Sequence, residues 1–575
     1  MNRLLKYLKD YKKECVLAPL FKMLEALFEL TVPLVIAQMI DRGIGNSDTS
    51  FVYIAFGILI ALGFIGLLVS CTAQYFAAKA ATGFSKDLRH DLFSHIMSFS
   101  FTEIDNVGTS TMITRMTSDV NILQNGVNMF LRLFLRSPFI VAGAMIMAFT
   151  IDVKSALVFV AVIFCLAIAV FVIMNTNIPL LKKSQQKLDE VLRLVRENLS
   201  GARVVRAFTL EDSQTEEFRE KNTRLTSFQL KAGKISGLLN PLTYVMINIA
   251  IVILIVIGED QNAAGVLTKG QIVALYNYMS QILIELIKFA NLIVTLNKSF
   301  ASAIRVNEIF DVSPSMKEAT DMDAVPSPEK DAPAVEYIDV SLKYHELSDE
   351  AVSDISFVIE PGKTFGIIGG TGSGKTTVAS MIPRFYDATK GIIKIFGRDV
   401  RDYPLDFVRK NVGIVMQHAT LFEGSIRDNL QWADPDASDE DILNACETAV
   451  CSEVVRDKGG LDAMIEAGGR NLSGGQRQRL CIARVLVGKP SILILDDSAS
   501  ALDYMTDQRL RENISKLSYD PTVIIIAQRA ISVQKCDSIL VLDDGQCVGL
   551  GSHEELLTSC AVYREIYESQ YGKED

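Results

Sequence analysis

The chain has 575 residues, too many for one hydrophobic core, so its length predicts several folding units. A formal net charge of −11 argues against a nucleic-acid partner, because proteins that bind nucleic acid present a basic surface to the phosphates. The nine cysteines lack CxxC pairs or regular spacing, so we expect reduced packing residues and no disulfide framework.

The first fourteen residues are basic and amphipathic, with Leu4, Leu5 and Leu8 at helical spacing. This pattern predicts a helix on the cytoplasmic membrane surface, with a solvated terminus as the alternative. Six later segments are apolar and long enough to cross about 30 Å of hydrocarbon at about 1.5 Å per residue. These predicted spans lie near residues 16–40, 51–80, 128–150, 155–178, 235–258 and 270–296.

The connections between the spans alternate between short and long. The long ones, 81–127 and 179–234, are charged, and the second is rich in lysine and arginine. The positive-inside rule therefore predicts a multi-pass protein of the cell inner (cytoplasmic) membrane with both termini in the cytoplasm. Apolar residues at helical spacing predict that the spans continue as helices into the cytosol, with polar turns near Phe101–Gly108 and Phe208–Ser213. These apolar residues are Leu88, Leu92, Ile96 and Phe99 in the first loop and Leu188, Leu192, Val195 and Leu199 in the second.

Several charged residues interrupt the apolar spans: Glu25 and Glu29, one helical turn apart, and Glu285 with Lys288. Charge in lipid is costly, so these side chains should face the bundle interior or water. The glutamate pair has two interpretations. It lines a pathway for cationic or amphipathic cargo, or it lies close enough to the interface to snorkel or to meet Lys22.

Residues 311–334 combine proline, acidic and small residues without periodicity, which is typical of an exposed linker. We therefore divide the chain into a transmembrane domain at 1–310, this linker, and a soluble domain at 335–575.

The soluble part contains a phosphate-binding pattern, GxxxxGK[ST], at Gly369–Thr376, between a strand-like Thr364–Ile368 and a helical Val378–Arg384. Glycines let backbone N–H groups wrap phosphates, Lys375 meets the β and γ oxygens, and Thr376 reaches Mg²⁺. A second strand ends in Asp496, whose carboxylate can hold the metal. The sequence therefore predicts an ATP and Mg²⁺ site that includes Gly369, Thr371, Gly372, Ser373, Gly374, Lys375, Thr376, Thr377 and Asp496.

A further motif, Leu472–Gln476, resembles the signature sequence peculiar to ABC proteins, and with the six spans the chain resembles the exporter branch of that family. The resemblance implies an α-helical membrane domain of six transmembrane helices, like a type IV ABC exporter, fused to an α/β P-loop ABC nucleotide-binding domain. It also implies coupling helices in the two cytoplasmic turns that rest on the nucleotide-binding domains, and a head-to-tail dimer in which each ATP lies between one chain's phosphate loop and the other's signature. The residues that it assigns are Tyr344 for adenine stacking, Gln417 for the metal and catalysis, Ser473, Gly474, Gly475 and Gln476 of the signature, and Asp503 of the loop Ser500–Asp503.

The chain departs from the family pattern at two catalytic positions. Asp497 stands where the family places a glutamate, and Gln528 stands where a switch histidine is expected. The shorter stem withdraws the carboxylate by about 1.5 Å, and a glutamine cannot become cationic. Hydrolysis should therefore be slow. The chain resembles the degenerate-site subunit of a heterodimeric bacterial multidrug exporter, whose partner carries the Walker B glutamate and the switch histidine.

The expected cargo is a hydrophobic or amphipathic small molecule, and membrane lipid is an expected partner. Two alternatives stay open: a homodimeric, slow exporter of lipid or peptide, and an ATP-gated channel or sensor. Six spans exclude a purely soluble ABC ATPase. An importer is disfavoured, since importers of this superfamily generally keep their membrane and nucleotide domains on separate chains.

Overall fold

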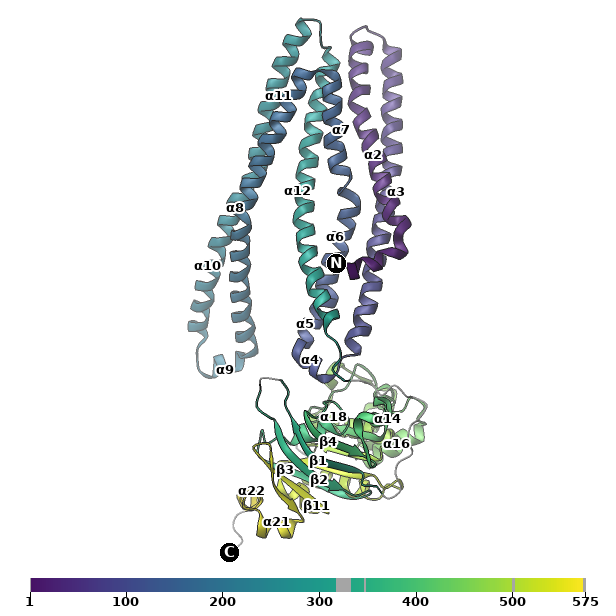
Figure 1. The fold of residues 1–575 in the computed structure, drawn as a ribbon, viewed down its shortest axis with the longest axis vertical. Coiled ribbons are helices and arrows are strands. Elements are labelled where there is room, and N and C mark those ends of the chain that lie inside the picture. The colour runs from purple at the N-terminus through teal and green to yellow at the C-terminus, as the bar shows by residue number, and fades with distance from the viewer. Residues whose placement is uncertain (1, 317–331, 346–347, 499–501, 572–575) are drawn as a thin grey trace. The chain divides into compact units, whose positions relative to one another are not determined.

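The computed structural model of the chain describes residues 2–316, 332–345, 348–498 and 502–571 (Figure 1). The chain divides into two compact units. The first comprises Met1–Met97 and Ser110–Asp311, and the second comprises Ser98–Thr109 and Val312–Asp575.

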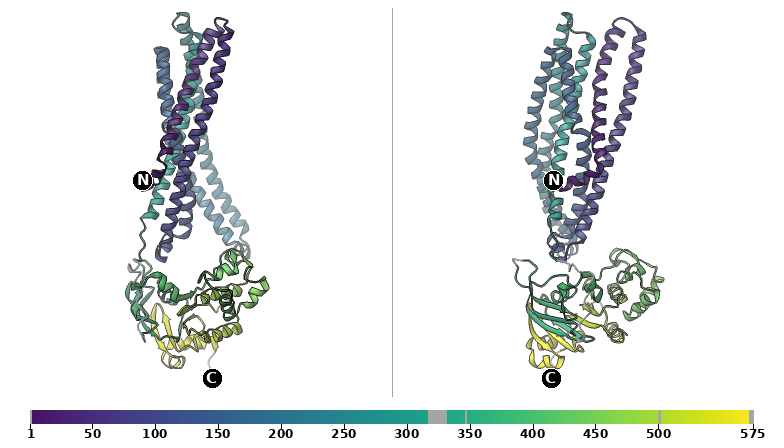
Figure 2. Two further views of the ribbon diagram at one scale, coloured as in Figure 1. Left: turned by 90° about the vertical axis from the view of Figure 1, so that its right-hand side faces the viewer. Right: turned by 45° about the vertical axis from the view of Figure 1, so that its right-hand side comes forward.

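The first unit is entirely helical, and in it the long helices α8 and α10 run side by side (Figures 1 and 2). Among the described residues, six helices are long and apolar enough to cross a membrane, which confirms the predicted number of spans. The elements are α1 (Asn2–Leu5), a 3₁₀ segment (Lys6–Tyr11), α2 (Lys12–Gln38), a π segment (Met39–Ile44), α3 (Thr49–Met97), α5 (Thr109–Thr114), a second π segment (Arg115–Asp119), α6 (Val120–Leu133), α7 (Arg136–Ile151), α8 (Val153–Ser200), α9 (Ala202–Ala207), α10 (Glu211–Gly237), α11 (Leu239–Ala263) and α12 (Lys269–Asp311).

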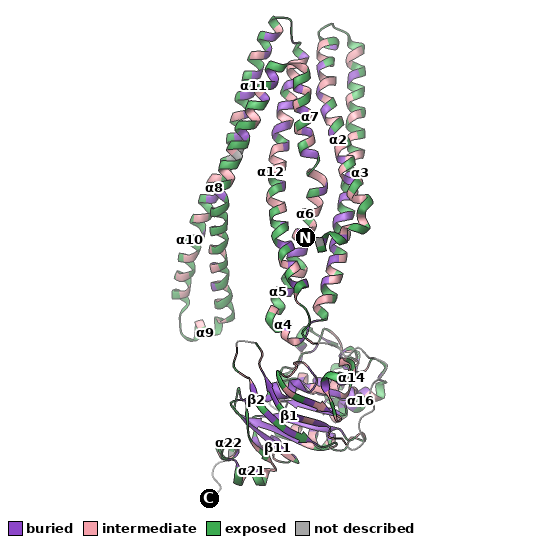
Figure 3. Ribbon diagram, viewed as in Figure 1, coloured by how far each residue is buried: buried purple, intermediate pink, exposed green. Residues whose placement is uncertain are grey.

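Many large apolar residues of this unit are exposed. Figure 3 shows exposed positions along its helices. Phe64 on α3 and Phe171 on α8 are 63% and 70% exposed. Exposure of large apolar side chains to this extent fits lipid as the surrounding solvent. The interior combines alanines with larger side chains such as Tyr278, whose hydroxyl donates to the Leu30 carbonyl over 2.7 Å.

Helices α3 and α8 contain 49 and 48 residues. At about 1.5 Å per residue they exceed a bilayer core of about 30 Å, so both continue beyond the membrane as predicted. One detail of the prediction was wrong. Helix α3 ends at Met97, so Phe99 lies in the following loop, where it is buried.

The second unit is an α/β domain built on a six-stranded sheet of order β12-β11-β3-β10-β9-β6. The strands from β11 to β6 are parallel, and β3, β9 and β10 are runs of buried residues, as expected for a sheet covered on both faces. These strands are β3 (Thr364–Gly369), β6 (Val412–Val415), β9 (Ile492–Asp496), β10 (Thr522–Ala527), β11 (Ser538–Asp543) and β12 (Gln546–Gly551). Ligands of open parallel sheets bind beyond the carboxyl ends of the strands, so β3, β9 and β10 point to one candidate site.

Besides a second sheet, of order β2-β1-β4-β5, the described part of Val312–Asp575 contains a two-stranded pair, ten α-helices and two 3₁₀ segments, Val400–Asp402 and Ala467–Gly469. The strands of the second sheet are β1 (Val335–Leu342), β2 (Val352–Ile359), β4 (Lys390–Ile395) and β5 (Arg398–Asp399), and the two-stranded pair is β7 (Gly424–Ser425) with β8 (Met464–Ile465). The helices are α13 (Lys375–Met381), α14 (Leu405–Asn411), α15 (Ile426–Leu430), α16 (Asp439–Thr448), α17 (Ser452–Lys458), α18 (Gly474–Val487), α19 (Tyr504–Ile514), α20 (Ala530–Val533), α21 (His553–Ser559) and α22 (Ala561–Tyr571).

One short helix, α4 (Phe101–Val107), packs with this domain although it follows α3 in the chain. Ser100 and Glu103 form a capping box at its start, and the Glu103 carboxylate also accepts from the Ser315 backbone N–H over 3.2 Å. The Phe101 ring stacks on Phe385 with 4.4 Å between the ring centroids. The first of the two predicted turns is therefore an ordered helix with its own contacts on the α/β domain.

Candidate functional site

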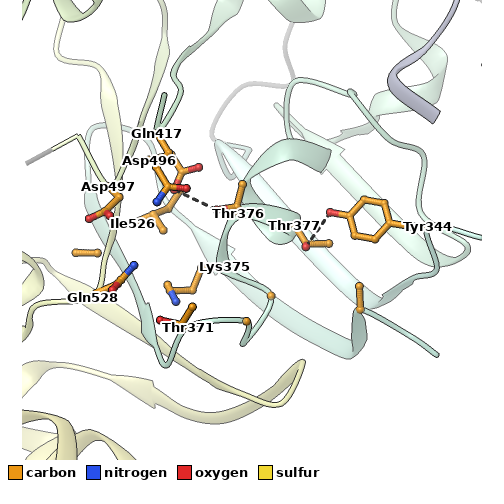
Figure 4. Close-up of a pocket in the computed structure, with 14 residues that line it drawn as sticks. Tyr344, Thr371, Lys375, Thr376, Thr377, Gln417, Asp496, Asp497, Ile526 and Gln528 are labelled. Atoms are coloured by element: carbon orange, nitrogen blue, oxygen red, sulfur yellow. Dashed lines mark hydrogen bonds between the residues drawn. The ribbon is translucent and has the colours of Figure 1, made fainter. Parts of the chain in front are cut away.

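A cavity of about 330 Å³ lies at the carboxyl ends of β3, β9 and β10 (Figure 4). Tyr344 lies at one end of it, Asp497 and Gln528 lie at the other, and Lys375 lies between them. The structure thus brings together most of the side chains that the sequence assigned to nucleotide binding. The predicted residues that line the cavity are Tyr344, Thr371, Gly372, Gly374, Lys375, Thr376, Thr377, Gln417, Asp496, Asp497 and Gln528.

The loop between β3 and α13 needs glycine for its backbone path. Gly372 and Gly374 adopt positive φ angles of 85° and 92°, which L side chains rarely tolerate. A Cβ on Gly369 would lie 2.1 Å from the Leu542 carbonyl oxygen. Gly369 and Ser373, which do not line the cavity, therefore shape the loop rather than its surface.

Lys375 is a buried cation, with only 8% of the residue exposed. Its ammonium donates to the carbonyl oxygens of Gly369 and Gly370 over 3.0 and 2.6 Å. Burial lowers the pKa of Lys375, and the negative charges of Asp496 and Asp497 oppose that shift. Among the described residues no carboxylate lies within ion-pair distance of it, so its charge is available to an anion in the cavity.

Asp496, at the end of β9, is 3% exposed and accepts a hydrogen bond from the Thr376 hydroxyl over 3.3 Å. Burial raises the pKa of Asp496, and the neighbouring Asp497 raises it further. Carboxylate, hydroxyl and amide oxygens are the donors that Mg²⁺ prefers. Thr376, Asp496 and Gln417 all line the cavity, so together they form a donor set that fits this ion.

Asp497 sits on a constrained backbone with a positive φ of 44°. Its N–H donates to the Ile526 carbonyl over 3.0 Å, which ties the position to β10. Burial raises the pKa of the Asp497 carboxyl, against the opposing charges of Lys375 and Arg529. The backbone is thus fixed by the sheet, and the length of the side chain decides how far the carboxylate reaches.

Gln528 is exposed at the mouth of the cavity, and a residue far along the chain holds its backbone. The Gln570 amide group on α22 donates to the Gln528 carbonyl over 3.0 Å, and its oxygen accepts from the Ala530 N–H over 2.8 Å. Sequence analysis missed Gln570, and no motif near the C-terminus could have identified it.

The Tyr344 hydroxyl makes a 2.9 Å hydrogen bond with the Thr377 hydroxyl. Its ring meets the Tyr386 ring at 88°, with 5.0 Å between the centroids. Burial raises the pKa of Tyr344, so its hydroxyl stays protonated. Tyr386 is a second residue that sequence analysis missed.

The signature residues lie outside this cavity. Ser473 caps α18, where its hydroxyl accepts from the Gln476 N–H over 3.3 Å, and both Ser473 and Gly474 are exposed, with Gly475 next in the helix. Asp503 caps α19 through the Thr506 N–H over 3.0 Å. The predicted Ser500 and Ala501 fall outside the described residues.

A second group of buried charges lies in the helical unit, at the start of α7. The Arg136 guanidinium donates to Glu285 over 2.7 Å and to both Glu29 oxygens over 2.8 and 2.9 Å. Glu285 also accepts from Lys288 over 2.8 Å, and Glu25 pairs with Lys22 over 2.5 Å. The contact of Glu25 with Lys22 is one of the two options in the second interpretation of the glutamate pair. Arg136 itself was missed, although an arginine inside the predicted span at 128–150 was a visible signal.

Comparison with known proteins agrees with this architecture. The sequence profile of the ABC transporter transmembrane region matches residues 15–286, and that of the ABC transporter domain matches residues 352–500. The uncharacterized ABC transporter ATP-binding protein YfiB of Bacillus subtilis is 34% identical over 576 residues, covering 100% of this chain and 99% of YfiB. YgaD of the same species, whose name assigns it provisionally to multidrug export, is 30% identical over 99% of both chains. A bacterial Atm1-family ABC exporter solved with ATP bound shares the fold, with a TM-score of 0.81, 22% identity and coverage of 98% of this chain and 99% of that one.

Proposed function

The chain belongs to the ABC transporter family, with its membrane and ATP-binding halves on one polypeptide, and on that premise we propose that it is one half of a heterodimeric exporter. In this arrangement its own ATP site hydrolyses slowly. Its signature completes the ATP site of a different partner chain, which carries the glutamate and the histidine that this chain lacks.

The phosphate loop supplies the binding half of the reaction. Lys375 is buried beside neutral carbonyl groups, so a triphosphate in the cavity would give its charge a counter-ion. Thr376, Asp496 and Gln417 would hold Mg²⁺, which neutralises charge on the phosphate oxygens when it is bound. The ring of Tyr344, at the other end of the cavity, offers a surface for the base.

The single observation that carries the slow site is the geometry of Asp497. Its backbone N–H is bonded to Ile526, so the main chain cannot advance to replace the missing methylene. A carboxylate about 1.5 Å short of the attacking water would slow the reaction by about a hundredfold. Gln528 adds to this effect, since a neutral amide cannot take up a proton as a histidine can.

The place of the signature supports a two-chain machine. Ser473 and Gly474 are exposed and do not line the chain's own cavity, so the Ser473 hydroxyl can donate to a nucleotide on another subunit. A competent partner would use them at its hydrolytic site. The slow site would meanwhile retain ATP and keep the two nucleotide-binding domains engaged.

For the cargo we propose hydrophobic or amphipathic small molecules, in line with the provisional name of YgaD. The charged cluster around Arg136 contains three cations, Lys22, Arg136 and Lys288, and three carboxylates, Glu25, Glu29 and Glu285. This balance removes the reason to favour cationic cargo. The loop at 179–234, which is rich in lysine and arginine, supports an inner-membrane location with both termini in the cytoplasm.

The test is the ATPase rate of the purified chain in lipid, alone and co-expressed with its genomic neighbour of similar length. We expect low activity alone, activity in the pair, and a rise of about a hundredfold at this chain's own site in the double variant Asp497→Glu, Gln528→His. Adding Lys375→Met to this double variant is the control, because the ATPase activity that the two substitutions restored at this chain's own site should be lost again. Fast hydrolysis by the chain alone would support the homodimer instead, and an unchanged rate in the double variant would contradict the slow-site proposal.

A further inference from the structure

The helix α4 is connected to the base end of the nucleotide cavity by a short series of contacts within one unit of the molecule. Asp105 on α4 accepts a 2.6 Å hydrogen bond from the Tyr386 hydroxyl. The Tyr386 ring meets Tyr344 at a right angle, and the Tyr344 hydroxyl is bonded to Thr377 at the phosphate loop. The side chain of Tyr344 is thus held at both ends.

Tyr344 also separates two cavities. The one already described holds the phosphate loop, and the other, of about 380 Å³, lies against Tyr386 and α4. Its polar lining comes from Thr102, Asp105, His345, Ser348 and Asp349. Space on this side means that the Tyr344 ring could turn away from the phosphate loop if Tyr386 did not hold it.

The Tyr386 hydroxyl is suited to a fixed hydrogen bond. Burial and the neighbouring Asp105 carboxylate raise the pKa of Tyr386 well above its usual value, so the phenol remains a donor at physiological pH. Next to it, Phe385 stacks on Phe101, which anchors the same stretch of α4 with a second contact.

We propose that Asp105 and Tyr386 are positioning residues for the nucleobase. They hold the Tyr344 ring in the orientation that a base can stack on, so the part of nucleotide affinity that comes from the base depends on α4. The inference rests on ATP binding at this cavity and not on slow hydrolysis or on a heterodimer.

Thermodynamic linkage then gives α4 a second role. If α4 strengthens base binding by some factor, a bound base strengthens the contact of α4 with the domain by the same factor. Binding of the base would therefore strengthen the contact of α4 with the domain, independently of the contacts that the nucleotide's phosphates make.

The test compares binding of ATP with binding of inorganic tripolyphosphate, which lacks base and ribose, to the full-length chain in lipid nanodiscs. In Tyr386→Phe and in Asp105→Ala we expect ATP affinity to fall about three- to tenfold, as for the loss of one hydrogen bond, while tripolyphosphate affinity is unchanged. The double variant should lose no more than either single one, since both remove the same bond. Asp349→Ala is the matched control, because it removes a carboxylate from the same cavity without touching Tyr386, and Tyr344→Ala sets the maximum loss.

A second readout is the hydrogen exchange of the α4 amides. ATP should slow their exchange in the wild type, and it should slow it much less in Tyr386→Phe. Equal losses of ATP and tripolyphosphate affinity, or full ATP affinity in both single variants, would overturn the proposal. A chain that bound neither ligand would instead refute the nucleotide site itself, so the two failures are distinguishable.

Discussion

The molecule buries charge in two places. In one the charges pair with opposite charges, and in the other they contact neutral groups. In the membrane unit, Arg136 is surrounded by carboxylates from α2 and α12, and three cations balance three anions. In the α/β domain, Lys375 contacts neutral oxygens, and Asp496 contacts a hydroxyl. Charges that are paired within the fold serve the fold, whereas buried charges without an ionic partner are available for a ligand. The comparison separates the structural cluster from the binding site without reference to any motif.

The largest expected effect comes from unbalancing the membrane cluster. Arg136→Met should destabilise the folded chain by about 3–5 kcal/mol, because the buried Glu285 and the partly exposed Glu29 would lose the cation that they share. Thermal unfolding in lipid or detergent measures this. Arg132→Met, four residues earlier and without an ion pair among the described residues, is the control, and adding Glu285→Gln to the Arg136 variant should recover part of the loss. If Arg136→Met left the stability unchanged, the ion pairs of this cluster would not be what stabilises the fold there.

Removal of the buried cation at the nucleotide site should weaken ATP binding and leave the stability of the chain nearly unchanged. Lys375→Met should leave the stability of the nucleotide-free chain unchanged or slightly higher, since burial lowers the pKa of Lys375 and so disfavours its charge. ATP affinity should fall by about 10- to 150-fold, as expected for charge-assisted hydrogen bonds of about 1.5–3 kcal/mol. Calorimetric unfolding with and without ATP distinguishes the two effects. A large loss of stability without nucleotide would show that Lys375 serves the fold.

A smaller effect is expected at Ser137, whose hydroxyl donates to Glu285 over 2.8 Å. Ser137→Ala removes one hydrogen bond and keeps the charge balance, so it should cost only about 1–2 kcal/mol. Unfolding measurements beside Arg136→Met would show whether charge balance or the number of hydrogen bonds dominates the cluster. Equal losses in the two variants would favour the hydrogen bonds.

The smallest expected effect is the pH dependence of the nucleotide site. Burial raises the pKa of Asp496, so protonation stabilises the folded form relative to the unfolded one. Without nucleotide, the stability of the wild type relative to Asp496→Asn should therefore rise as the pH falls from neutrality through the raised pKa, and level off below the ordinary value of 3.8. Mg²⁺-dependent ATP affinity should fall over the same window, because the metal needs the carboxylate. If the relative stability and the ATP affinity both rose or both fell as the pH fell, the assignment of Asp496 as the titrating metal ligand would be contradicted.

Much of the architecture could be predicted from local sequence. The spans are continuous apolar runs, and the phosphate loop is a contiguous motif whose glycines, such as Gly374, are required by backbone angles. The end of α3 was less certain, because Leu88, Leu92, Ile96 and Phe99 continue the helical spacing past Met97, where the chain turns toward α4. Apolar spacing does not mark where a helix stops when the next residues are buried by another element.

Local sequence is enough to locate the six spans, the phosphate-loop motif and the two positions that depart from the family pattern, because each depends on residues that are close in the chain. The folded structure was needed to find that Arg136 pairs with Glu29 and Glu285, at separations of 107 and 149 residues, and Tyr386 with Asp105, at 281. Such pairs depend on how the helices and strands pack. The identity of a side chain does not specify which distant residue will pack against it. These contacts could therefore be identified only in the folded molecule.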